Sequence, residues 1–87
     1  MGMKEVRQAF VSEVGTAATV SSATMSYETL DTIQYQRLEF RGAFVADNAP
    51  FSIRSDRIPP SGDLLEAARA TAARLLKERK PGEGQPT

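Results

Sequence analysis

The chain has 87 residues, with eleven Lys or Arg, eleven Asp or Glu, and neither His nor Cys. This length gives one domain with a thin core, and the absence of cysteine excludes disulfides and thiolate metal sites. The balanced charge gives no overall attraction to nucleic acid or anionic lipid, and no apolar run approaches the roughly 20 residues of a membrane span.

The first predicted element is a helix over residues 3–14. Its apolar residues recur at spacings of three and four, which places them on one helical face; they are Met3, Val6, Phe10 and Val14. Gly15 follows, as is typical of a helix C-terminal cap.

The next segment is rich in Thr, Ser and Val, so we predict a strand over 18–27. Its small hydroxyl side chains bury little surface, which favours an edge position in the sheet.

The segment 32–46 is predicted as the second strand, but its apolar residues occupy two phases of the two-residue alternation. Ile33 and Tyr35 have one phase. The other phase holds Leu38, Phe40 and Phe44. A regular strand sends these two sets to opposite faces of the sheet.

Two local structures would bring both apolar sets to the same face. A β-bulge near residues 36–37 would shift the phase by one residue. Alternatively, residues 26–37 would form a short helix. The Thr, Ile and Tyr residues of 32–35 favour a strand, and we therefore prefer a bulged strand that begins after a break at 28–31.

A tight connection at 47–50, with the sequence DNAP, joins this strand to a third one. Asp and Asn favour turns because their side chains bond to nearby backbone, and Pro avoids central strands. Phe51 and Ile53 then repeat the apolar alternation. The paired prolines 59 and 60 end the third strand.

The clearest helix in the sequence begins after Asp63 and runs to residue 80, because it consists largely of Ala, Leu, Arg, Glu and Lys. Asp63 with Glu66 three residues later resembles a capping box. The predicted core stripe of this helix is Leu65, Ala68, Ala72, Leu75 and Leu76. Residues 81–87 contain no apolar side chain, so we predict a single domain over 1–80 and a disordered tail over 81–87.

The order helix, strand, strand, strand, helix predicts an α+β fold. The simplest arrangement is a three-stranded antiparallel β-meander with the N-terminal and C-terminal helices packed on one face.

The same order of elements resembles that of the double-stranded-RNA-binding domain. That family begins its last helix with a basic segment of the Lys-Lys-x-Ala-Lys type, whereas residues 63–67 here read DLLEA. The resemblance is therefore one of element order, and we infer no membership.

The sheet face opposite the helices is the candidate binding surface. If Leu38, Phe40 and Phe44 face the helices, the residues between them face outward. The predicted partner-binding residues on this face are Tyr35, Arg37, Arg41 and Arg54, with Glu39, Ser52 and Asp56 among them. Arg and Tyr are enriched in protein interfaces and also contact phosphates and bases. A lattice of cross-strand ion pairs is the purely structural alternative.

These observations predict a non-enzymatic, cytoplasmic interaction module of the inhibitor or adaptor type, of bacterial or phage origin, which binds a protein partner. Without His or Cys, the common catalytic bases and nucleophiles are absent, and we expect no catalytic residues, metal or cofactor. The alternative is a nucleic-acid-binding domain that uses the same arginines and the basic residues of the last helix, which are Arg69, Arg74, Lys77, Arg79 and Lys80. A homodimer through a sheet edge or an apolar patch is also possible for so small a core.

Overall fold

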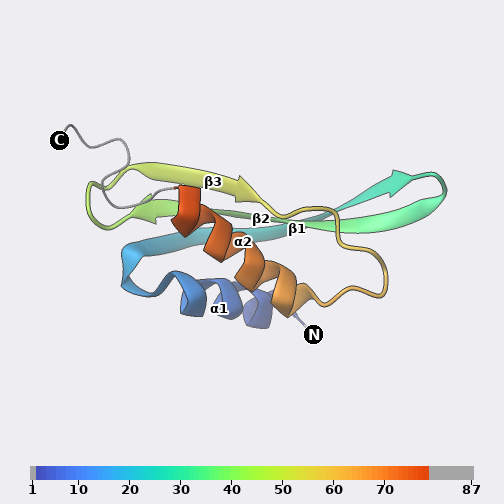
Figure 1. Cartoon of the computed structure of the whole chain (residues 1–87), viewed down its shortest axis with the longest axis horizontal. Helices are drawn as coiled ribbons and strands as arrows, with labels where there is room; N and C mark the ends of the chain where they lie inside the picture. Colours follow the sequence, from blue (N-terminus) through green and yellow to red (C-terminus); the bar gives the residue numbers. More distant parts are fainter. Residues whose placement is uncertain (1, 79–87) are drawn as a thin grey trace.

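A computed structural model describes residues 2–78 and confirms the predicted α+β architecture. The three strands form one antiparallel sheet in the order β1-β2-β3, and both helices lie on the same face of it (Figure 1). The elements are α1 (Met3–Val14), a short 3-10 turn η1 (Gly15–Ala17), β1 (Ala18–Leu30), β2 (Ile33–Phe44), β3 (Pro50–Arg54) and α2 (Leu64–Glu78). The predicted helix end at 79–80 and the predicted tail at 81–87 lie outside the described residues.

The core lies between the two helices and the inner end of the sheet. Phe10 of α1 stacks on Phe40 of β2 with ring centroids 4.0 Å apart, and both side chains are fully buried. From α2, Ala68 and Ala72 are also fully buried, which confirms the predicted alanine-rich stripe. Thr71 lies in the same stripe, and its hydroxyl donates to the Ala67 carbonyl. That bond satisfies a polar group that burial would otherwise make costly.

The helix ends follow the sequence signals. Gly15 ends α1 with a φ of 59°, a conformation that glycine adopts without steric cost, and its N–H donates to the Val11 carbonyl. At the start of α2, Asp63 Oδ1 accepts hydrogen bonds from the N–H groups of Leu65 and Glu66. Asp63 is therefore the N-cap, as predicted.

The β1–β2 hairpin is longer than predicted, and its turn is tighter. β1 continues to Leu30 and pairs with β2 without interruption from Ser22 outward, and only Asp31 and Thr32 lie between the strands. Both turn residues have positive φ, 51° and 65°, which is the geometry of the two-residue turns that join twisted strands. The predicted break at 28–31 and the alternative helix at 26–37 are therefore wrong. Cross-strand pairing outweighed the local turn signal of the acidic residues.

The predicted bulge near residues 36–37 is also wrong, because β1 and β2 pair regularly through that region. The irregularity lies instead in β1, between Val20 and Ser22, directly after the pair of Val20 with Gly42 of β2. A Cβ on Gly42 would lie 1.9 Å from the Thr19 carbonyl oxygen. The two apolar phases are thus real: Leu38, Phe40 and Phe44 are buried, while Ile33 and Tyr35 lie on the opposite face.

The outer end of the hairpin projects beyond both helices (Figure 1). It carries three large exposed apolar or aromatic side chains, namely Tyr27, Leu30 and Ile33. This end of the sheet has no helix beneath it, and pairing between β1 and β2 is its main support.

Candidate functional site

The face of the sheet that the helices leave uncovered, called here the open face, carries the predicted binding residues. Leu38 and Phe40 of β2 are fully buried against the helices, so the alternation of the strand sends Arg37, Glu39 and Arg41 to the other side. The orientation predicted for the hairpin, with apolar side chains inward and guanidinium groups outward, is what the structure has.

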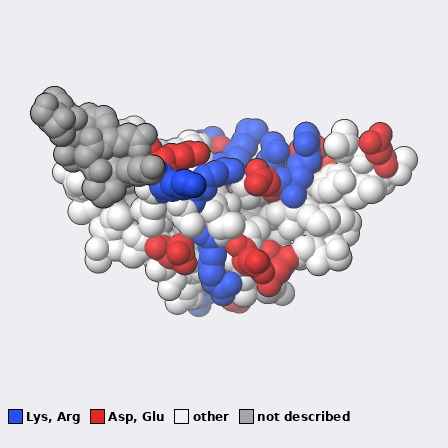
Figure 2. All heavy atoms as spheres, in the orientation of Figure 1, with Lys and Arg blue, Asp and Glu red and all other residues white. Residues whose placement is uncertain are grey.

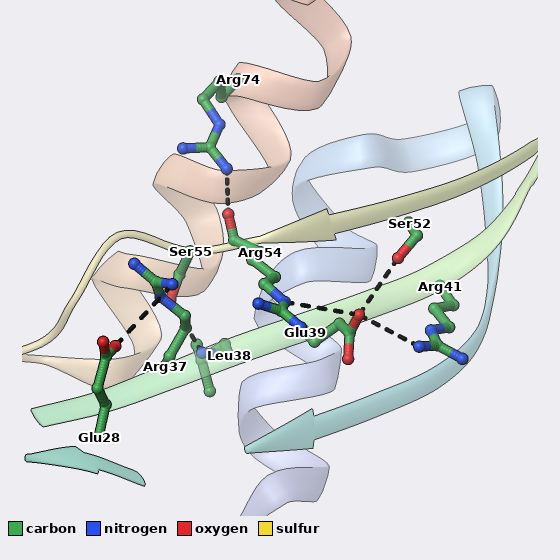
Figure 3. A network of polar contacts seen from close by, with 9 residues as sticks. All are labelled: Glu28, Arg37, Leu38, Glu39, Arg41, Ser52, Arg54, Ser55 and Arg74. Atoms are coloured by element: carbon green, nitrogen blue, oxygen red, sulfur yellow. Dashed lines mark hydrogen bonds and ion pairs between the residues drawn. The ribbon is translucent and has the colours of Figure 1, made fainter. Parts of the chain in front are cut away.

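Glu39 is the centre of one cluster on the open face (Figure 3). Its Oε2 atom lies 3.3 Å from Arg41 Nη2, 3.3 Å from the Ser52 hydroxyl and 3.9 Å from Arg54 Nε. The side chains of Arg41 and Arg54 are 62% and 66% exposed. A guanidinium has five N–H donors, so one shared carboxylate oxygen cannot accept hydrogen bonds from all the donors of both arginines. Each arginine therefore keeps donors that are accessible to another molecule.

Glu28 is the centre of a second cluster, nearer the projecting end. Arg57 Nη2 lies 3.0 Å from Glu28 Oε2, and Arg37 Nη1 lies 4.0 Å from Glu28 Oε1. The hydrogen bond from Arg57 lowers the pKa of Glu28, and the same bond raises the pKa of Arg57. Tyr35 is the cross-strand partner of Glu28, so it belongs to this cluster.

The structure thus places all four predicted residues, Tyr35, Arg37, Arg41 and Arg54, on the open face. It divides them between the two clusters. Arg37 is the least available arginine because its side chain is only 28% exposed. Asp56, expected beside them, instead pairs with Arg74 of α2 at 3.4 Å.

Two residues of the open face were not predicted. Glu28 was missed because we predicted a break that began there. In the structure Glu28 is part of β1, and its side chain lies on the same face of the sheet as that of Arg37 in β2. Arg57 lies in the irregular segment after β3, where no alternation exists to read. The structure shows that this segment stays bound to β2, through the hydrogen bonds of Ser55 with Leu38 and of Ile58 with Gln36.

The open face is locally basic in a chain of zero net charge. Four arginines, at positions 37, 41, 54 and 57, are set against Glu28 and Glu39. Figure 2 shows basic side chains gathered along the side of the molecule that the sheet forms, with acidic ones among them. The basic residues of α2 do not extend this surface as one patch, because Arg74 is bound to the Arg54 carbonyl, Asp56 and Glu78. Arg79 and Lys80 lie outside the described residues.

A pocket of about 280 Å³ lies between the segment after β3 and the first half of α2. Apart from Glu66, its charged side chains already have structural partners: Asp63 caps α2, and Arg74 binds Asp56. Arg57, also at the pocket, binds Glu28. The pocket therefore offers no set of free polar groups that would orient a small ligand.

Within residues 2–78 no cluster of acidic side chains is arranged to hold a metal ion. No helix in that same range has the length and apolar character needed to cross a bilayer. No protein-family model, curated protein or solved structure matches the chain significantly.

Proposed function

We propose that this chain is a non-enzymatic interaction module, of the inhibitor or adaptor type, that binds an acidic surface of a protein partner through the open face. The observation that carries the proposal is the Glu39 cluster. Two highly exposed arginines share one carboxylate oxygen, so most of their donors lack a partner within the cluster. The same proposal assigns the protein to the cytoplasm, on its lack of cysteine, and to a bacterial or phage source, on its alanine and arginine content.

The energetics of exposed ion pairs support this role. Such pairs contribute about 0–1 kcal/mol, because water screens them and ordering the side chains has an entropic cost. Arg41 and Arg54 are therefore held near their binding positions by Glu39 without being strongly retained there. A carboxylate of the partner, placed in a less solvated interface, would form stronger bidentate contacts with the same groups. Tyr35 adds an aromatic contact of the kind enriched at interfaces.

Glu39 itself gives the sharpest test, because it competes with an acidic partner for the same arginines. Once a partner is captured with the tagged full chain, the affinity of the purified pair is measured for three variants. The double charge reversal Arg41→Glu with Arg54→Glu should weaken binding by about a hundredfold or more. Glu39→Gln should strengthen it severalfold. Arg69→Glu, a reversal on the exposed surface of α2, is the matched control and should change little.

Equal affinities for the wild-type protein and the open-face reversal would refute the proposal.

Binding of nucleic acid by the same arginines is the competing function, and a mobility-shift assay over a salt series tests it. Affinity that falls steeply with salt, with a slope near the number of phosphates contacted, and that is lost in the reversal variant would favour nucleic acid instead. The start of α2, with Asp63 as its N-cap and Glu66 in its first turn, is unfavourable for a phosphate contact there.

A further inference from the structure

The two edges of the sheet are protected very differently. β3 is a short strand, Pro50–Arg54, that begins with proline, and Arg74 of α2 donates a hydrogen bond to the Arg54 carbonyl. Proline and a covering side chain are common ways of preventing another strand from pairing with an edge. The β3 edge is therefore closed.

The β1 edge is closed only at its inner end. There the irregularity between Val20 and Ser22 interrupts the strand, and Arg7 of α1 donates to the Val20 carbonyl at 2.6 Å. Residues 22–30 follow, with no proline, lysine or arginine and with Glu28 as their one charged residue. This stretch lacks the usual edge protection.

The hydrogen bonds of β2 show which backbone groups of β1 point away from the sheet. Leu38 and Gln36 direct their N–H and C=O groups toward the β3 side, to Ser55 and Ile58. Their partners across β1, Met25 and Tyr27, consequently form non-hydrogen-bonded pairs with them and present their own backbone groups at the free edge. By the same alternation, Ala23 and Thr29 do so as well.

We propose that this edge pairs with the same edge of a second copy of the chain, in antiparallel orientation, about a two-fold axis at Ser26. In this register Met25 lies opposite Tyr27 of the second copy, and Ala23 lies opposite its Thr29. All four residues with outward backbone groups are then hydrogen-bonded. The result is a six-stranded sheet with all four helices on one face. This proposal does not depend on the proposed function.

The side chains fit a second copy in this register. Tyr27 is 58% exposed and has no helix beneath it. The dimer packs Tyr27 against a methionine, a favourable sulfur–aromatic contact. On the open face Glu28 lies opposite Thr24 and Ser26 lies opposite itself, so no like charges meet. Assembly stops at two copies because the outer edges of the new sheet are the closed β3 edges, beyond which only the short outer end of β2 is left uncovered.

The dimer also has a consequence for the open face. Both copies present their open faces on the same side of the joined sheet, so two Glu39 clusters become parts of one surface. Any partner of that surface would then meet two arginine sets related by symmetry.

Cysteine cross-linking tests the register directly, because the natural chain contains no cysteine. Residues opposite each other in a non-hydrogen-bonded pair have Cα atoms about 4.5 Å apart, within disulfide range. Ser26→Cys should therefore form an intermolecular disulfide rapidly under mild oxidation. The matched control is Thr24→Cys, on the same face and also exposed. Its two symmetry copies would be four residues apart along the strands, and it should cross-link at least about tenfold more slowly.

Sedimentation of the wild-type protein over a concentration series supplies the second measurement. We expect twice the monomer mass, with the Tyr27→Lys and Thr29→Pro variants shifted toward monomer. Circular dichroism checks that both variants remain folded, as expected for substitutions at exposed positions with an outward N–H. A monomer at every concentration up to about 1 mM, which corresponds to only about 4 kcal/mol of association energy, would overturn the proposal. Equal cross-linking rates for the two cysteine variants would overturn the register.

Discussion

The inner and outer ends of the β1–β2 hairpin belong to the same pair of strands but are stabilised in different ways. At the inner end, β2 contributes Leu38, Phe40 and Phe44 to a core covered by both helices. At the outer end, Tyr27, Leu30 and Ile33 are exposed and no helix lies beneath the strands (Figure 1). Burial specifies the inner end, whereas turn geometry and cross-strand pairs specify the outer one. The outer end is consequently free to take a role in recognition or assembly.

The largest expected contrast between the two ends comes from removing an apolar side chain at each. Phe40→Ala deletes a fully buried ring that stacks on Phe10 and should lower the free energy of unfolding by about 3–5 kcal/mol. Ile33→Ala, at the exposed end of the same strand, should change it by less than about 1 kcal/mol. Urea unfolding monitored by circular dichroism measures both. Similar losses for the two variants would mean that the Ile33 side chain is packed in solution and that burial also specifies the outer end.

The next contrast concerns how β2 is bonded where β3 ends. The buried Ser55 hydroxyl accepts a hydrogen bond from the Leu38 N–H at 2.9 Å, and it donates to the Asp56 carbonyl. Ser55→Ala leaves that buried N–H without an acceptor and should cost about 1–3 kcal/mol. Ser52→Ala removes an exposed hydroxyl from the neighbouring strand and serves as the control. If both variants lose the same small amount, water replaces the hydroxyl at Leu38.

The sequence predicted the inner end well and the outer end poorly, for the same physical reason. Apolar periodicity reports burial, so the helix faces, the inward direction of Phe40 and the outward direction of Arg41 could all be read from it. At the outer end Ile33 and Tyr35 are apolar or aromatic without being buried. Because we took their spacing as a sign of burial, we predicted a bulge that the structure does not have. Ser55 continues the inward alternation of Phe51 and Ile53, but it is polar, so apolar periodicity does not mark it. Arg57 lies in the irregular segment after β3 and has no periodic signal.

The turn at the outer end should be improvable. Asp31 and Thr32 both have positive φ, which is unfavourable for a β-branched residue such as threonine. The double substitution Asp31→Asn with Thr32→Gly gives the preferred sequence for this turn and should raise the free energy of unfolding by up to about 1 kcal/mol. Thermal unfolding of the wild type and the double variant measures the change. Thr29→Gly, within the strand beside the turn, is the control and should destabilise. A double variant less stable than the wild type would mean that the turn has another geometry.

The smallest expected effect is electrostatic and concerns the Glu28 cluster, nearer the outer end. The hydrogen bond from Arg57 lowers the pKa of Glu28 from an ordinary value of 4.5, so the folded state favours the carboxylate. A lowered pKa contributes stability above about pH 4.5, and the contribution disappears as the pH falls through the folded-state pKa. Glu28→Gln should therefore be slightly less stable than the wild type at pH 7, and the difference should vanish toward pH 3.

Urea midpoints measured from pH 7 to pH 3 test this dependence, and Glu13→Gln on the exposed side of α1 is the control. A pH-independent difference between the Glu28 variant and the wild type would show that the glutamate contributes through packing instead of charge. Such a result would bear on the Glu28 cluster. Arg37 and Arg57 would then be positioned by the backbone alone, and a partner's carboxylates would meet no internal competitor for these two arginines.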